Sequence, residues 1–118
     1  MLFYTIFEMK KDKSLIQIKK GALEYCVLAV IAEGEKYGYE IVKVLTERGL
    51  TTHEGTIYPL LSRLHKEGLV QAAWRESGSA VPRKYYRATR DGMRALNEFK
   101  ESWSHFSQSV DGILWGEQ

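Results

Sequence analysis

The sequence predicts a mainly α fold with a small two-stranded β wing, arranged as a winged helix-turn-helix and followed by one long C-terminal helix. Three observations predict this fold. Apolar residues recur at helical spacing in three successive segments, each of which ends near a glycine. Two runs with the composition of β-strands follow, separated by a loop of turn residues. Beyond them, apolar residues recur every three or four positions, which is typical of an amphipathic helix.

Apolar spacing predicts the first two helices. The first is apolar on nearly all sides and ends near Gly34, which indicates a central, buried helix. Its apolar residues are Leu23, Val27, Leu28, Ala29, Val30 and Ile31. The second runs from about Tyr37 to Leu45 and is amphipathic. It ends at Gly49, a residue suited to the left-handed conformation that follows many helices.

The third helix is predicted from near Thr56 to Gly68. Its apolar face consists of Ile57, Leu60, Leu61 and Leu64, at the spacing of one helical stripe. Its opposite face is short, polar and basic, and consists of Thr56, Pro59, Ser62, Arg63 and Lys66. Proline is tolerated only near the start of a helix, so the first turn is expected close to Pro59. Thr52, His53 and Thr56 are alternative N-caps.

The wing is predicted from two strand-like runs. Val70, Ala72 and Trp74 alternate with more polar residues, which indicates a strand with one buried face. The second run, Arg83 to Arg87, is rich in cations and tyrosine. The residues between the runs are too many for a two-residue hairpin, so a longer loop is expected at the wing tip. At least one tyrosine of the second run should pack inward, because neighbouring side chains of a strand point to opposite faces.

Three sequence blocks resemble the PadR family of bacterial transcriptional regulators. They are KYGYEIVKVL at 36–45, GTIYPLLSRLHKEGLV at 55–70 and PRKYYRATRDG at 82–92, and they span most of residues 21–103 in the family's order. Ala88 departs from the leucine that is usual in the family. The chain is similar to the short subgroup with a single C-terminal helix. The resemblance implies a DNA-binding regulator, most simply a repressor.

Charge is concentrated where this interpretation places DNA. The chain carries only +2 overall, but residues 63–94 hold eight cations and three acids, a local +5. Such a run is by itself equally typical of a solvated surface; its coincidence with the third helix and wing favours DNA binding. We expect the third helix to enter a major groove and the wing to contact phosphates or an adjacent minor groove. The predicted DNA-binding residues are Thr56, Tyr58, Pro59, Ser62, Arg63, Lys66, Arg75, Arg83 and Lys84.

The alternative to a DNA-binding protein is an adaptor whose winged helix binds another protein, because a fold alone does not establish a partner. The basic exposed face distinguishes the two, since an adaptor would more often present apolar or acidic side chains there.

The C-terminal helix, expected from near Thr89, carries a heptad seam. The seam consists of Leu96, Phe99, Trp103, Phe106, Val110 and Ile113, spaced 3, 4, 3, 4 and 3. Such an apolar stripe is too large to remain exposed, so it predicts a homodimer whose seam is filled by the partner's first helix, around Leu15 to Ile31, with Leu23 and Val27 as its contacts. The alternative is that the helix folds back onto its own domain. A two-fold dimer would present two reading helices to a palindromic operator.

The seam also predicts a candidate effector site. Two copies of Trp103 near a two-fold axis would wall a flat apolar slot. The family resemblance implies planar or cationic hydrophobic compounds as ligands, so Trp103 and Phe106 are the candidate contacts. Packing within an apolar core is an equally good interpretation of both rings.

An enzyme is the weakest hypothesis. His53, His65 and His105 lack the spacing of metal ligands, and Cys26 lies in an apolar helix, so neither a cofactor nor a metal is predicted. A single cysteine favours a reducing cytoplasm. The apolar segment at 2–7 is too short to span a membrane. We expect residues 1–14 to be a poorly ordered extension, 15–88 the DNA-binding domain, and 89–118 the dimerisation helix.

Overall fold

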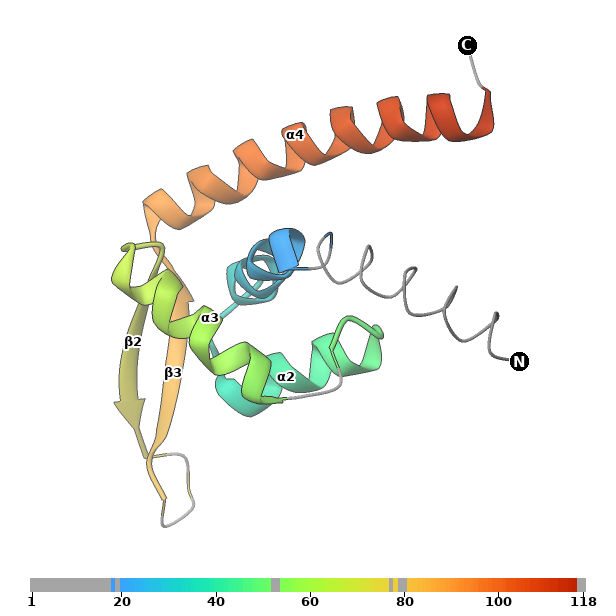
Figure 1. The fold of residues 1–118 in the computed structure, drawn as a ribbon. Coiled ribbons are helices and arrows are strands. Elements are labelled where there is room, and N and C mark those ends of the chain that lie inside the picture. Colours follow the sequence, from blue (N-terminus) through green and yellow to red (C-terminus); the bar gives the residue numbers. More distant parts are fainter. Residues whose placement is uncertain (1–17, 19, 52–53, 77, 79–80, 117–118) are drawn as a thin grey trace, which may run out of the picture.

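The computed structural model describes residues 18, 20–51, 54–76, 78 and 81–116 (Figure 1). An N-terminal helix at residues 20–32 is followed by β1 (Lys36–Tyr37), α2 (Gly38–Glu47) and α3 (Glu54–Lys66). The chain continues through β2 (Val70–Arg75) and β3 (Arg83–Ala88) into α4 (Arg90–Trp115). This order confirms the predicted winged helix-turn-helix with a long C-terminal helix. The expected extension at residues 1–14 lies outside the described residues.

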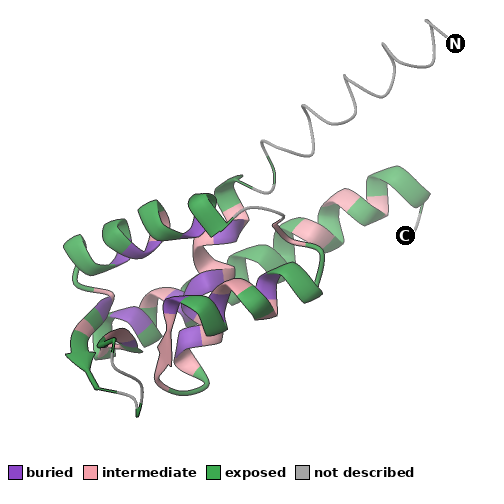
Figure 2. Ribbon diagram, turned by 90° about the horizontal axis from the view of Figure 1, so that it is seen from below, coloured by how far each residue is buried: buried purple, intermediate pink, exposed green. Residues whose placement is uncertain are grey.

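The hydrophobic core lies where the N-terminal helix meets α2, α3 and the base of the sheet (Figure 2). Each helix contributes the residues of its apolar stripe, and Val70, Tyr86 and Leu96 close the core from β2, β3 and α4. Val27 is fully buried, and Leu23 and Leu96 are nearly so. These three residues pack in the core of their own domain, and their place in a dimer interface stays a prediction.

The start of α3 differs from the sequence prediction by two residues. The helix begins at Glu54, so Thr56 is its third residue and not its cap. The other two candidate caps, Thr52 and His53, lie outside the described residues. Pro59 lies inside the helix as its sixth residue and removes one backbone hydrogen bond. The burial of Ile57, Leu61 and Leu64 on the opposite face keeps the helix in place.

The sheet has three strands and not the two that were predicted. The strand order is β1-β3-β2 and both pairings are antiparallel. β1 pairs Lys36 with Tyr86 and Tyr37 with Tyr85, so the predicted second helix begins one residue later, at Gly38. β2 buries Val70 and half-buries Ala72, whereas Trp74 is 69% exposed. The hairpin therefore extends beyond the core, and only its base is covered.

α4 is joined closely to the turn between α3 and β2. Thr89 caps the helix by accepting a hydrogen bond from the Gly92 amide at 3.0 Å. The Thr89 hydroxyl also donates to the Gly68 carbonyl at 2.7 Å, and the Thr89 amide donates to the Leu69 carbonyl at 3.1 Å. The helix then passes over the N-terminal helix and extends beyond it (Figure 1). No described helix is both long and apolar enough to cross a membrane.

Candidate nucleic-acid interface

A hollow of about 440 Å³ lies between α3, the wing and the start of α2, and we term it the reading groove. Residues of β1, α2, α3, β2 and β3 line it, so the groove brings side chains from distant parts of the sequence together. Its lining residues are Tyr37, Gly38, Tyr39, Tyr58, Ser62, Trp74, Arg83, Lys84 and Tyr86. The groove brings together four of the predicted DNA-binding residues, namely Tyr58, Ser62, Arg83 and Lys84.

Tyr58 is positioned on α3 by a close approach to the start of α2. A Cβ atom on Gly38 would lie 2.8 Å from Cε1 of Tyr58, so only glycine leaves room for the ring. The ring remains 44% exposed toward the groove. Behind it, burial and the neighbouring Tyr58 raise the pKa of Tyr86, so the Tyr86 hydroxyl stays protonated at neutral pH. The groove floor is therefore neutral and aromatic.

Two cations of β3 line the groove without an acidic partner among the described residues. The Lys84 ammonium lies 5.9 Å from the Trp74 ring centre and 5.8 Å from that of Tyr86. The Arg83 guanidinium lies 4.5 Å from the Tyr37 ring centre. Cation–π contacts orient these groups without neutralising their charge. Both cations therefore remain available to an anionic partner.

The exposed face of α3 continues the interface away from the wing. Ser62, Arg63, Lys66 and Glu67 line a second, shallow depression, and Thr56 and Pro59 are exposed on the same helix. Arg63 is not free, because its guanidinium pairs with Glu24 of the N-terminal helix at 3.6 Å. Its side chain is nevertheless 61% exposed, so a weak ion pair leaves it within reach of solvent.

Arg75 does not lie in the reading groove. It pairs with Glu35 through both terminal nitrogens, one of them at 2.6 Å. Cross-strand pairing places Arg75 opposite Arg83, and Ala73 opposite Tyr85, whereas Trp74 and Lys84 point to the other face. Arg75 thus forms a partly exposed ion pair on the sheet face opposite Trp74 and Lys84, and its predicted contact with DNA stays a prediction.

Five groove residues are not among the predicted DNA-binding residues: Tyr37, Gly38, Tyr39, Trp74 and Tyr86. The sequence pattern places the first three in a helix and Trp74 on a buried strand face, and it expects at least one of Tyr85 and Tyr86 to pack inward. The available signal was the sequence Tyr37-Gly38-Tyr39, because two tyrosines around a glycine place two rings and a residue without a side chain at the start of α2.

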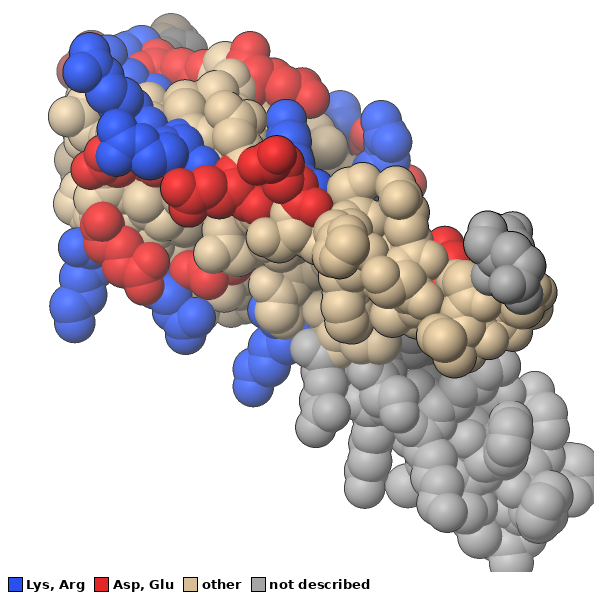
Figure 3. Space-filling model, turned by 90° about the horizontal axis from the view of Figure 1, so that it is seen from above, with Lys and Arg blue, Asp and Glu red and all other residues tan. Residues whose placement is uncertain are grey.

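The predicted seam on α4 divides into a packed part and an exposed part. Phe99 stacks on Tyr25 of the N-terminal helix, with ring centres 4.1 Å apart and planes at 4°. These rings begin an aromatic ladder along α4: the Phe99 and Trp103 ring centres are 5.9 Å apart, and those of Trp103 and Phe106 are 6.2 Å apart. The exposed fractions are 41% for Trp103, 59% for Phe106 and 85% for Ile113. Figure 3 shows a broad surface with few charged side chains toward the C-terminal end of α4.

Cys26 lies half-buried on the N-terminal helix. Burial raises the pKa of its thiol, which therefore stays protonated at neutral pH. A protonated thiol is a poor nucleophile, so Cys26 has the character of a packing residue.

The model of the "Transcriptional regulator PadR-like family" matches residues 27–98, which contain α2, α3, the wing and the first part of α4. The chain belongs to the PadR family. Members of this family are transcriptional regulators and not enzymes, which confirms the expectation that this PadR-like chain has no catalytic site.

Solved structures of other PadR regulators resemble this chain over 66–93% of its length. A PadR family transcriptional regulator from Eggerthella lenta is 33% identical with a TM-score of 0.83, covering 93% of this chain and 96% of its own. A PadR-like regulator from Bacillus cereus is 42% identical with a TM-score of 0.76, covering 83% and 96%. Bacillus subtilis PadR, solved in complex with operator DNA, is 28% identical with a TM-score of 0.61, covering 66% of this chain and 46% of its own.

Proposed function

We propose that this PadR-like regulator is a homodimeric, sequence-specific repressor that holds a palindromic operator with α3 and the wing. The observation that carries the proposal is the reading groove, where Arg83 and Lys84 have no acidic partner among the described residues. Three other arginines, Arg63, Arg75 and Arg94, pair with acids. Two cations without an acidic partner thus line the groove beside the exposed face of α3.

The groove supports a division of roles between its two walls. The exposed polar side of α3 has the width and chemistry to enter a major groove, where Ser62 and Arg63 reach base edges. Lys84 and Arg83 then lie over the flanking phosphates. The aromatic rings of Tyr58 and Trp74 line the groove beside these cations. The solved complex of the Bacillus subtilis relative with operator DNA supports the same use of the fold.

The test begins with selection of bound duplexes from random DNA, followed by affinity measurements at several salt concentrations. Lys84→Ala should weaken all duplexes similarly and lower the slope of log affinity against log salt by about 0.9. Lys43→Ala is the matched control, because Lys43 is exposed on α2 and lies outside the groove lining. Failure of the folded protein to bind any duplex at low salt would favour the adaptor alternative. An equal slope change in both variants would remove Lys84 from the interface.

The exposed part of the α4 seam supports the homodimer. Phe106, Val110, Ile113 and Leu114 line an apolar depression, and an apolar surface of this kind on a small domain is typical of a protein interface. A second copy presents the same surface, which suits a two-fold contact. Ile113→Lys should produce monomers in sedimentation, whereas Asn97→Lys, at an exposed position outside the seam, should leave the dimer intact. A normal dimer in Ile113→Lys would place the interface elsewhere.

Repression requires only that the dimer occupies the operator, so it needs no further contact surface. The response to an effector rests on Trp103 and Phe106, whose half-exposed rings continue the aromatic ladder toward the proposed partner. A flat hydrophobic compound should quench tryptophan fluorescence, and Trp103→Ala should lose that binding while the dimer still holds DNA. Operator affinity that is equal with and without bound compound would remove the effector role and leave repression unaffected.

A further inference from the structure

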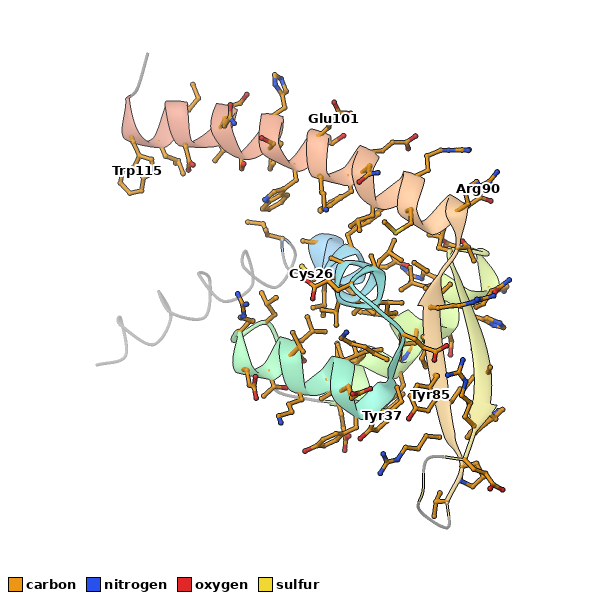
Figure 4. The ribbon with its side chains drawn as sticks, turned by 180° about the vertical axis from the view of Figure 1, so that it is seen from behind. Cys26, Tyr37, Tyr85, Arg90, Glu101 and Trp115 are labelled. Atoms are coloured by element: carbon orange, nitrogen blue, oxygen red, sulfur yellow. The ribbon has the colours of Figure 1, made fainter. Side chains whose placement is uncertain are left out.

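Five side chains form a continuous contact series between the wing and the start of α2. Glu35 pairs with Arg75, and the Arg75 guanidinium lies 5.4 Å from the Tyr85 ring centre. The Tyr85 ring lies 5.5 Å from that of Tyr37, tilted by 58°, and Arg83 covers Tyr37 at 4.5 Å. Figure 4 shows Tyr37 at the start of α2 beside Tyr85 on β3. We term these five residues the wing anchor.

The body of the protein supplies one side of the wing anchor. Glu35 and Tyr37 belong to the segment between the N-terminal helix and α2, where β1 adds to the edge of the hairpin. The Tyr37 amide donates a hydrogen bond to Oε1 of Glu40 at 3.0 Å, which fixes Tyr37 at the helix start. The hairpin supplies the other side through Arg75, Tyr85 and Arg83. The series therefore connects the wing to α2 across the sheet.

We propose that Glu35 and Tyr37 are positioning residues that set the direction of the wing. In this proposal Arg75 connects Glu35 to Tyr85 and does not contact phosphate. The inference rests on the proposed DNA-binding function and assigns roles that the reading groove itself does not give. Its starting point is the geometry of the hairpin. The core buries only the base of the sheet, so Trp74 and Arg75 extend into solvent. Contacts outside the core must fix their position.

The position of the wing decides where Arg83 lies. Arg83 is at the far end of the series, over Tyr37, and it lines the reading groove. A wing that is already oriented loses less conformational freedom when DNA binds, so the anchor raises affinity without touching DNA. Glu35 acts through Arg75 and Tyr85, and Tyr37 acts directly on Arg83.

Glu35→Gln separates this inference from simple electrostatics. Removal of a negative charge near DNA ordinarily strengthens binding to polyanions. Loss of the anchor predicts the opposite, a weakening of about two- to fivefold, the range that one partly exposed ion pair supports. Glu33→Gln is the matched control, since Glu33 is an exposed acid of the same turn and the charge change is identical. It should bind as tightly as the original protein or more tightly.

Arg75→Ala provides the second arm of the experiment. If Arg75 acts only through the anchor, the double variant Glu35→Gln/Arg75→Ala should bind DNA no more weakly than Arg75→Ala alone. A phosphate contact from Arg75 predicts instead that Glu35→Gln strengthens binding in both backgrounds. Tighter binding by Glu35→Gln than by the original protein would overturn the inference.

Hydrogen exchange supplies a readout that does not depend on DNA. The backbone amides of β3 should exchange at least about twofold faster in Glu35→Gln than in Glu33→Gln, because the edge of the sheet opens more often. Unchanged exchange overturns the anchor even if the protein binds no duplex at all. Weak DNA binding by the original protein would count against the proposed function, and the exchange experiment would still decide the anchor.

Discussion

Gly92→Ala tests the joint between the reading elements and α4. A Cβ atom at this position would lie 2.0 Å from the Leu69 carbonyl oxygen and 3.0 Å from its carbon. Both atoms belong to the backbone of the turn after α3, so no side chain can rotate away to make room. The first turn of α4 must therefore move off that turn.

The magnitude follows from the contacts that the movement breaks. Overpacking against backbone costs about 1–3 kcal/mol. The hydrogen bonds from Thr89 to the Gly68 and Leu69 carbonyls contribute about 1 kcal/mol each. The better helix propensity of alanine stabilises α4 by at most about 1 kcal/mol relative to glycine. The free energy of unfolding should fall by about 2–4 kcal/mol, which lowers the Tm of a domain of this size by roughly 8–16 °C.

Thermal and urea unfolding, followed by circular dichroism, measure this loss. Gly55→Ala is the control, because Gly55 lies in α3 and an added Cβ there meets nothing within 4 Å. Its stability should stay the same or rise slightly. A Gly92→Ala protein that unfolds at the same temperature as Gly55→Ala would refute the reasoning, because the turn after α3 would then accommodate the added Cβ atom without any loss of stability.

Three further outcomes are expected. Gly38→Ala should displace the Tyr58 ring, whose Cε1 lies 2.8 Å from the added carbon, and so weaken DNA binding while the Tm changes little; equal affinity would mean that the ring position is unimportant. Arg63→Ala should cost about 1–3 kcal/mol of operator affinity if Arg63 reads a base, whereas Glu24→Gln, which releases the same side chain, should not. Because the pKa of Tyr86 is raised in the folded state, unfolding free energy should fall as pH rises above its ordinary value of 10.0, and Tyr86→Phe should flatten that slope.

Local patterns were sufficient to predict the helices. The apolar stripes of the first three helices pack in the core, and each of these helices ends close to its predicted glycine. The Thr89 cap of α4 was also predictable, because threonine is a preferred N-cap residue whose hydroxyl accepts from an amide of the first turn. Helix boundaries depend on neighbours along the chain, and the sequence contains that information directly.

The third strand and the role of Arg75 depend on residues far apart in the sequence. β1 has only two residues, too few for any alternation to be recognised, and it exists because β3 lies beside it. Arg75 meets Glu35 across 40 positions. Alternation along β2 divides its residues between two faces, but it does not reveal which face holds an acid. Composition alone therefore predicts a DNA contact for Arg75, and the sequence contains no sign of its pairing with Glu35.

The α4 seam shows a different limit of pattern reasoning. One uninterrupted heptad repeat runs from Leu96 to Ile113, yet its first two members pack on their own chain and the later ones are exposed. A repeat specifies that a stripe needs an apolar partner, but an intramolecular and an intermolecular partner satisfy it equally.

This division has a consequence for the proposed effector response. Phe99 belongs to the packed part and Trp103 to the exposed part, and their rings are neighbours at 5.9 Å. A compound that displaces Trp103 therefore presses on a ring already stacked against Tyr25. Because the first turn of α4 is fixed to the Gly68–Leu69 turn, the helix cannot tilt without moving the end of α3. The contacts between the first turn of α4 and the Gly68–Leu69 turn would transmit a tilt of α4 to α3. Because Gly92→Ala disrupts these contacts, it should also weaken the effect of a bound compound on operator affinity.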